Sequence, residues 1–583
     1  MSAESLYRRL CRSRGLVAGA LAALCLVAFL GSGTPDEAAD WVYRGGTILT
    51  LEGEKGGAVE ALAVKGTRIV YAGDADGLAP WCGPATRVVD LAGGTLLPGF
   101  TDAHFHLRNF GTILRTLNLV GTKSWEDVVM RVGERAAALP AGQWIVGRGW
   151  DQNDWDEKEF PTSAAIDAAV PGRLVYLRRV DGHAALASRA ALERAGITAA
   201  TPDPPGGRIV RDAAGEPTGL LIDAATDAVS SIIPEPTDAE RDSILTVAVR
   251  ACAAAGLTGV HDAGTDVRTL DALARMDAAG RLPIRVYSFV DTEDPGFLRV
   301  VEAGPRVPRW NERLTVRGVK IHLDGALGSR GAAMETPYSD DPANTGLLQL
   351  DDEEFTHLTS LAWERGFQIA THAIGDRANR MTLDRYEALL RGSAEGASVD
   401  RRPRIEHAQI LAPADIARFG ALGVIASMQP THATSDMPWA EARVGAERIR
   451  GGYAWRSLID SGARVAFGSD CPVESHRPLL GVYAAVTRQD AGGEPRGGWM
   501  PGERVTRLEA LEAFTSGAAY ASFDEARLGT LAVGKEADCV LLDANPLEVD
   551  ARELPRVRVL GTWVGGQLVF AERGLNLALA TVE

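Results

Sequence analysis

Two histidines one residue apart, His104 and His106, close an apolar run in the segment PGFTDAHFHL. Side chains at positions i and i+2 of a β-strand point to the same face, so both imidazoles can reach one metal ion. Imidazole nitrogen is a natural ligand for zinc and similar divalent ions. With ten histidines in 583 residues, such a pair is suggestive without being decisive. The rest of the chain must show whether it is half of a metal site.

Other residues that could bind a metal ion lie at the ends of further apolar segments that resemble strands. They are Lys320 in TVRGVKIHLDG, His372 in FQIATHAIGD, His407 in RPRIEHAQI and Asp470 in ARVAFGSD. A lysine inside a barrel strand is costly unless it is paired or modified, which indicates a role for Lys320. Singly, each has an ordinary explanation: a hydrogen-bonded histidine, an N-capping aspartate, or a lysine paired with Asp324. Together they predict a metal site.

Eight apolar runs, separated by helical stretches rich in Ala, Arg and Glu, would position these residues. The runs lie at 95–106, 256–264, 284–290, 315–325, 367–376, 402–410, 423–430 and 463–470. Strand–helix alternation implies a parallel sheet, and eight repeats fit an α/β fold with a closed (β/α)8 barrel, similar to a TIM barrel. Catalytic groups of such barrels gather at the carboxyl ends of the strands, where these candidates fall.

The remaining segments divide into two β-rich ends and one large insertion. Short strands punctuated by glycine at 40–97 and 525–583 predict a small β-sandwich domain formed by both termini. The barrel is then expected over 98–524. About 150 residues separate the first run from the second, too many for a loop, so 107–255 is predicted to be a folded insertion over the barrel mouth.

The first 39 residues read as a targeting segment. Four arginines precede the apolar run 16–30, and small residues follow it, which is the pattern of a secretory signal peptide. The alternative is an N-terminal membrane anchor, although the run is short for a full span. We therefore expect the protein to be exported, to the periplasm or outside the cell, or anchored to the membrane by this segment.

The charge and the cysteine content of the chain limit the classes of partner and site that can be expected. The formal net charge is −16, and no Lys/Arg block occurs beyond the N-terminus, which argues against nucleic acid as a partner. The six cysteines show no C-x-x-C spacing, so neither a disulfide framework nor a zinc–cysteine site is predicted. A small-molecule substrate is expected, with membrane contact only through the N-terminal segment; a homodimer is compatible with the sequence.

The motif set resembles the amidohydrolase superfamily, and within it the amidohydrolase 3, or YtcJ-like, group. The residues that carry the resemblance are PGFTDAHFHL, VKIHLDGALGSRGAAM, THAIGDRAN, RIEHAQ and FGSDCPV, with GWDQNDWD, VDGHAALASRAAL and GEPTGLL in the insertion. The resemblance covers residues 41–570. It implies a metal-dependent hydrolase with a (β/α)8 barrel beside a β-sandwich.

The resemblance also implies a role for each candidate ligand. His104 and His106 match the pair that binds one metal. Asp470 matches the acid that binds the same metal and handles the proton. His372 and His407 match the ligands of a second metal.

Lys320 matches the lysine that bridges the two metals after carboxylation by CO2. Carboxylation would replace the buried ammonium cation by an anionic carbamate, which can bind metal. The expected cofactor is therefore a pair of divalent ions, Zn²⁺, with a single ion as the alternative.

The expected reaction is hydrolysis of a non-peptide C–N bond by a metal-activated hydroxide, with a linear, N-substituted amide as the favoured substrate. Asp470 would accept the proton and pass it to the leaving nitrogen. Cys471 is not expected to be a nucleophile, because no base accompanies it. The residues expected to contact substrate are Trp150, Asp151, Arg179, His183, Asp324 and Arg330. His261 and His322 are candidates for orienting the ligands.

Two alternatives remain open at this point. The same metals would serve a cyclic amide hydrolase or a deaminase. An exported binding or regulatory protein without catalysis is the other, although the complete ligand set argues against it. The fold and the metal site do not choose the substrate.

Overall fold

The computed structural model describes residues 38–579, except 54, 181, 308–311, 393–399, 574 and 576. The predicted targeting segment, residues 1–39, therefore lies almost wholly outside the described part of the chain. None of the helices formed by the described residues combines the length and the hydropathy that spanning a bilayer demands.

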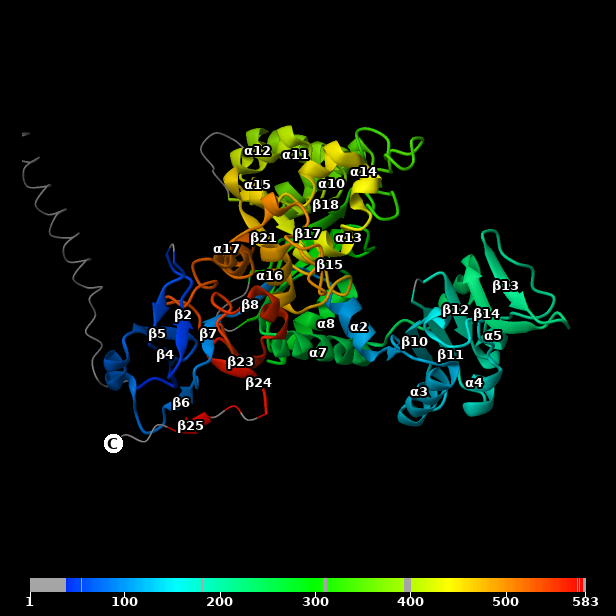
Figure 1. The fold of residues 1–583 in the computed structure, drawn as a ribbon, viewed down its shortest axis with the longest axis horizontal. Helices are drawn as coiled ribbons and strands as arrows, with labels where there is room; N and C mark the ends of the chain where they lie inside the picture. The colour runs from blue at the N-terminus through cyan, green and yellow to red at the C-terminus, as the bar shows by residue number, and fades with distance from the viewer. Residues whose placement is uncertain are drawn as a thin grey trace, which may run out of the picture.

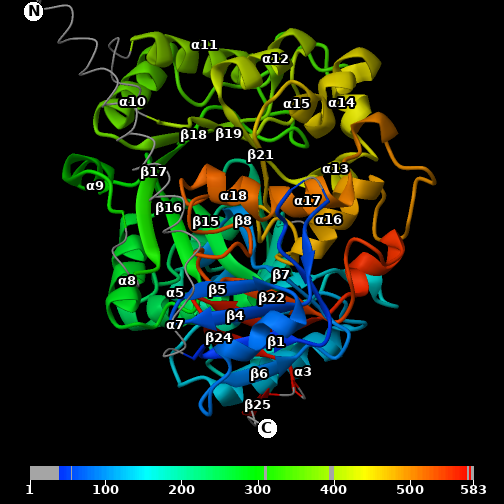
Figure 2. The same ribbon diagram turned by 90° about the vertical axis from the view of Figure 1, so that its left-hand side faces the viewer.

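A parallel sheet of eight strands forms the centre of the molecule (Figures 1 and 2). Its strands, which neighbour one another in chain order, are β8 (Phe100–Phe105), β15 (Leu257–Thr265), β16 (Arg285–Asp291), β17 (Leu314–His322), β18 (Gln368–Ala373), β19 (Arg404–His407), β20 (Ile425–Met428) and β21 (Val465–Phe467). A parallel bridge between Phe105 and Cys471 brings the first and last strands together. The sheet thus curls into a nearly closed barrel, which confirms the predicted fold.

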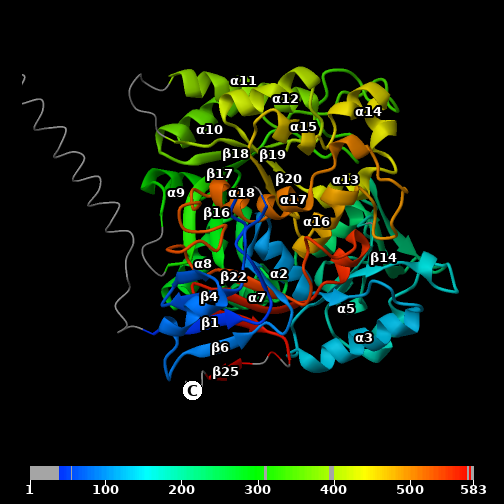
Figure 3. The same cartoon turned by 60° about the vertical axis from the view of Figure 1, so that its left-hand side comes forward.

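Helices cover the outside of this barrel, as Figure 3 shows for α10, α11 and α12. The longer ones are α7 (Asp238–Ala254), α8 (Val267–Ala278), α10 (Asp352–Glu364), α11 (Asp376–Gly392), α12 (Pro413–Leu422) and α16 (Pro478–Thr487). Local sequence fixes where they begin: Thr237 and Glu240 form a capping box at the start of α7, each bonding the other's backbone. Strands covered in this way are apolar on both faces. A polar side chain inside the barrel is therefore conspicuous.

Both ends of the chain contribute to two further sheets beside the barrel. One has the order β25 (Leu577–Leu579), β6 (Arg87–Asp90), β1 (Trp41–Arg44), β4 (Ala61–Lys65) and β5 (Arg68–Gly73). The other has the order β24 (Gln567–Ala571), β23 (Val559–Val564), β22, β7, β2 and β3 (Ala58–Val59). In the second, β7 (Thr95–Pro98) pairs in parallel with β2 (Thr47–Leu49) and antiparallel with β22 (Cys539–Leu542), so N- and C-terminal segments interleave. Trp563 packs edge-on against Tyr43 between the sheets. The predicted β-domain built from both termini is present.

The long segment between β8 and β15 folds around a six-stranded sheet of its own. Its strands, in spatial order, are β13 (Gly207–Arg211), β14 (Pro217–Asp223), β12 (Ala184–Ala187), β11 (Val175–Arg179), β10 (Ile145–Trp150) and β9 (Leu117–Asn118). Figure 1 draws this sheet beside the barrel. The segment begins with α2 (Leu107–Arg115) and ends with α7, and these two helices pack on each other. Buried residues of both helices belong to the same hydrophobic core as the barrel strands. The position of the insertion over the mouth stays a prediction.

Candidate metal centre

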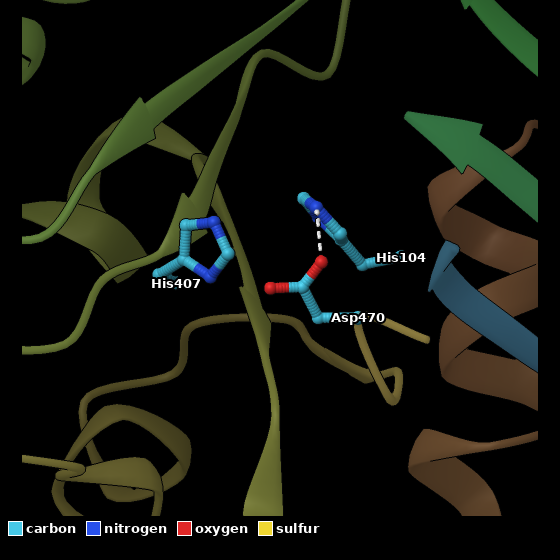
Figure 4. A group of neighbouring side chains, drawn as sticks. All are labelled: His104, His407 and Asp470. Carbon is cyan, nitrogen blue, oxygen red and sulfur yellow. Dashed lines mark ion pairs between the residues drawn. The ribbon is translucent and has the colours of Figure 1, made fainter. Parts of the chain in front are cut away.

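The carboxyl ends of the barrel strands bring the predicted ligands together. His104 lies on β8, His106 directly follows that strand, and Asp470 lies three residues past β21. Oδ1 of Asp470 is 3.0 Å from Nε2 of His106 and 3.6 Å from Nε2 of His104. Figure 4 shows the Asp470 carboxylate between His104 and His407, and donor atoms of these three residues lie within 4.8 Å of one another.

Lys320 and His372 complete the group from β17 and β18. Nζ of Lys320 is 3.4 Å from Nε2 of His104. The His372 ring centroid lies 4.5 Å from that of His407, and the His407 centroid lies 4.8 Å from that of His104. All six predicted ligands therefore face one space at the end of the barrel.

Several polar atoms in this space are buried and make no hydrogen bond within the described structure. They are Nε2 of His372, Oδ1 of Asp470, Nε2 of His432 and Nδ1 of His322. A buried polar atom without a partner costs free energy, so such atoms are rare unless a ligand or ion completes them. Nitrogen and carboxylate donors of this kind suit zinc and similar divalent cations. The residues present fit a bound metal.

The charge states of the site also suit metal binding. Burial and the neighbouring Lys320 lower the pKa of His104 to about 3. Burial likewise holds the pKa values of His372 and His407 well below the usual range. These rings are therefore neutral, which is the form that binds metal. Burial also lowers the pKa of Lys320.

The backbone is strained at two of the ligands. His407 has φ 72° and Asp470 has φ 56°, a left-handed region that side chains other than glycine seldom adopt. The chain also passes close to His104 just before Asp470: a Cβ on Gly468 would lie 2.4 Å from the backbone nitrogen of His104. The side chain of Asp102 accepts hydrogen bonds from both the backbone and the hydroxyl of Ser469 at the same junction. Strained residues of this kind cluster at functional sites.

A buried ion pair that sequence reasoning missed holds His104 in place. Nδ1 of His104 lies 2.5 Å from Oε2 of Glu406, which fixes the ring so that Nε2 faces the site. Arg404 donates to Oε1 of Glu406 and to the carbonyl of Ala103. Burial alone would raise the pKa of Glu406, but Arg404 and His104 outweigh it and hold that pKa well below its usual range. The signal was two charged residues inside the apolar run RPRIEHAQI.

The two histidines predicted to orient ligands have different neighbours. Arg404 donates to Nδ1 of His261, so His261 supports the ion pair behind His104. His322 lies at the end of β17, with Nδ1 3.3 Å from a carboxylate oxygen of Glu293. His407 is oriented instead by Gln429, whose Oε1 is 2.8 Å from Nδ1 of the ring.

Four of the residues expected to contact substrate belong to the insertion. Trp150 is fully buried in its core, and its indole N–H donates to the carbonyl of Leu177. Arg179 donates to Asp151 over 2.6 Å. His183 is exposed, with Nδ1 2.8 Å from Oδ1 of Asp223. The structure gives these side chains contacts within the insertion and does not bring them to the ligand cluster; their contact with a substrate stays a prediction.

The other two expected substrate contacts follow the lysine strand. Asp324 is buried beside His372 and accepts hydrogen bonds from the backbone N–H groups of Ala333, Ile374 and Gly375. It therefore organises the loops after β17 and β18; the described structure contains no ion pair between it and Lys320. Arg330 makes a two-pronged ion pair with Asp340 near the surface. Contact of either side chain with a substrate stays a prediction.

Comparison with known proteins identifies a family and several similar proteins. The model of the amidohydrolase family designated Amidohydro_3 matches residues 87–570. The chain is 34% identical to YtcJ of Bacillus subtilis (strain 168), whose name refers to an amidohydrolase, over 91% of this chain and 99% of YtcJ. It is 30% identical to the N-substituted formamide deformylase of Arthrobacter pascens, over 88% of this chain and 95% of that enzyme.

A solved structure agrees with these sequence matches. The uncharacterised metal-dependent hydrolase of Pyrococcus furiosus superimposes with a TM-score of 0.72 at 30% identity. The match covers 87% of this chain and 100% of the Pyrococcus chain.

Proposed function

This chain belongs to the amidohydrolase family and is a metal-dependent hydrolase of C–N bonds other than peptide bonds, and we propose that its substrate is a linear, N-substituted amide. The observation that carries the chemistry is the cluster of His104, His407 and Asp470, whose donor atoms lie within 4.8 Å of one another. The choice of amide is supported by the similarity to the formamide deformylase across most of both chains.

Asp470 is the residue that moves the proton in this proposal. A bound divalent cation would supply Lewis acidity and lower the pKa of water. One carboxylate oxygen of Asp470 faces the predicted ligands, and the other is free to accept the proton that water loses as its oxygen attacks the amide carbon. The same proton then goes to the leaving nitrogen as the C–N bond breaks. The products are a carboxylic acid and an amine.

Lys320 is proposed to be carboxylated and to hold a second cation. It is 1% exposed, and no carboxylate lies within ion-pair distance of its Nζ in the described residues. A buried, unpaired ammonium is unfavourable, whereas reaction of the neutral amine with CO2 gives an anion that two cations can share. With His372 and His407 nearby, the donor set suits two Zn²⁺ ions.

Location and assembly are proposed from the sequence alone. The basic and apolar pattern of residues 1–39 supports export to the periplasm or the extracellular space, or anchoring to the membrane. A homodimer is the proposed assembly. Fractionation with and without residues 1–39, and light scattering of the purified protein, test these two points.

Metal analysis and a substrate panel test the function. Purified protein is expected to contain zinc, to release an amine from N-substituted formamides, and to show the mass of CO2 on Lys320 in native mass spectrometry. Faster turnover of cyclic ureas or aminopyrimidines would favour the cyclic hydrolase or deaminase instead. A protein that binds no metal and hydrolyses none of these compounds would be a binding or regulatory module.

A further inference from the structure

His432 lies inside the site but outside the six ligands assigned by family resemblance. Its ring stacks on that of His407, with 6.0 Å between the centroids and 16° between the planes. Its Nε2 is 3.7 Å from Oδ2 of Asp470, too far for a hydrogen bond. This nitrogen is buried and makes no hydrogen bond within the described residues. A buried nitrogen without a hydrogen bond is unfavourable, which indicates that a bound ligand supplies the partner of Nε2.

The two oxygens of Asp470 divide the site into two sides. Oδ1 faces the imidazoles of His104 and His106, and Oδ2 faces His432. The nitrogen of His432 therefore lies beside Asp470 on the side away from His104 and His106. A molecule attacked beside Asp470 would therefore have the cluster on one side and Nε2 of His432 on the other.

The helix that carries His432 is hydrogen-bonded to its surroundings at both ends. It lies in the first turn of α13 (Pro430–Asp436), which starts directly after Gln429. Gln429 contacts His407, as described above. At the other end of α13, Asp436 accepts hydrogen bonds from the Gln409 amide over 2.9 Å and from the Tyr453 hydroxyl over 2.7 Å. A side chain supported at both ends of its helix is preorganised for contact with a ligand.

We propose that His432 is a catalytic residue whose Nε2–H donates a hydrogen bond to the carbonyl oxygen of the substrate, an inference that rests on the function proposed above. When water adds to the carbonyl carbon, negative charge gathers on that oxygen. A donor already in place stabilises the transition state more than the ground state. Removal of one such donor typically lowers kcat by about 100- to 1000-fold.

Two substitutions separate hydrogen bonding from packing: His432→Phe, which keeps a ring, and His432→Gln, which keeps an N–H donor. His357→Phe is the matched control, because His357 is exposed on α10. The measurements are kcat and KM on N-substituted formamides and zinc per chain by elemental analysis. We expect His432→Phe to lose at least about 100-fold in kcat with unchanged zinc. His432→Gln should keep at least about tenfold more activity than His432→Phe, and the control should match the wild type.

Formate gives a readout that needs no turnover, because it is the carboxyl product of formamide hydrolysis. Calorimetry should show formate binding at least about fivefold more weakly to His432→Phe than to the wild type, with no change in His357→Phe. The hydrogen-bonding role is overturned if zinc per chain falls in His432→Phe, which would make His432 a ligand. Equal losses in the Phe and Gln variants, or a kcat within about threefold of the wild type, also overturn it.

The two proposals fail in different ways. If the wild-type protein turns over a cyclic or amino-substituted substrate but no formamide, the linear-amide proposal fails. The His432 variants are then compared on that other substrate, where the same order of activities is expected. If the wild type hydrolyses formamides and the variants do not differ from it, only the role of His432 fails.

Discussion

The buried polar groups at the carboxyl ends of the barrel strands differ in hydrogen bonding from those at the amino ends. At the carboxyl ends, Oδ1 of Asp470 and Nε2 of His372 are buried without hydrogen bonds. At the amino ends, Arg285 donates two hydrogen bonds to Asp538, over 2.7 and 2.9 Å, and also lies 3.5 Å from Glu536. Arg313 nearby donates to the carbonyls of the neighbouring chain segments.

The difference supports the proposal that the chemistry takes place at the carboxyl ends. The charged groups at the amino ends complete one another and join the barrel to the terminal sheets, which is a structural role. The groups at the carboxyl ends are neutral histidines and an under-bonded carboxylate, whose remaining bonding capacity is directed at a common space. Single buried atoms without a hydrogen bond also occur elsewhere, such as the hydroxyl of Tyr43 and the indole nitrogen of Trp563 in the terminal sheets. The signal of a functional site is therefore a group of such atoms close together, as at the carboxyl ends of the barrel strands.

The largest expected effect comes from Asp470→Asn. This change removes a predicted ligand and the proton acceptor together, so kcat should fall at least about 1000-fold, or about 4 kcal/mol of barrier. In metal-free protein the same change should lower the free energy of unfolding by less than about 1 kcal/mol, because the amide can keep the 3.0 Å contact with Nε2 of His106. Steady-state kinetics and urea titration of the metal-free protein measure both. A large loss of stability would show that Asp470 has a structural role, like the charged residues at the amino ends of the strands, and would contradict the comparison.

Asp538→Asn should show the reverse pattern. Losing the carboxylate opposite the mostly buried Arg285 should lower the free energy of unfolding by about 3 kcal/mol. The folded fraction should keep wild-type kcat, because Asp538 lies at the opposite end of the strands from the ligand cluster. Urea unfolding and assays at low temperature separate the two quantities. A fall in kcat with unchanged stability would contradict the structural role.

Glu406→Gln lies between these extremes, because the charged pair with Arg404 supports a ligand. The weaker acceptor at Nδ1 of His104 should reduce zinc affinity by about 10- to 100-fold. Competition with a fluorescent zinc chelator measures the affinity, and Glu364→Gln on the exposed side of α10 is the control. Unchanged zinc affinity would show that Glu406 serves the barrel core rather than the metal.

The barrel could be predicted from the sequence because its strands are buried on both faces. The run 284–290 differs from β16 by one residue at each end, and the run 256–264 differs from β15 in the same way. Apolar runs bounded by polar helices are local features, and chain order equals strand order in this barrel. Because these features are local, the sequence also predicts that His372 and His407 lie at the ends of their strands, as the structure shows.

The parts that could not be predicted depend on contacts between distant segments. Glu406 meets His104 across 302 positions of sequence, so the motif that contains it says nothing of its partner. His432 was missed because it follows the seventh run on a short helix, where no ligand was expected. Trp150 shows the converse: its motif resembles the family, while the structure buries it in the core of the insertion.

The smallest expected effect contrasts two cations on one strand, Arg317 and Lys320 of β17. The Arg317 guanidinium stacks on Phe523, 3.5 Å from the ring centroid. Arg317→Met should lower the free energy of unfolding by about 0.5–1 kcal/mol and leave kcat unchanged. Lys320→Met, three residues further along, should leave stability nearly unchanged and lower kcat by about 10- to 100-fold, because its Nζ lies 3.4 Å from Nε2 of His104. Urea unfolding and kinetics of the two variants would show whether function depends on which end of the strand a cation occupies; equal loss of activity in both would contradict that division.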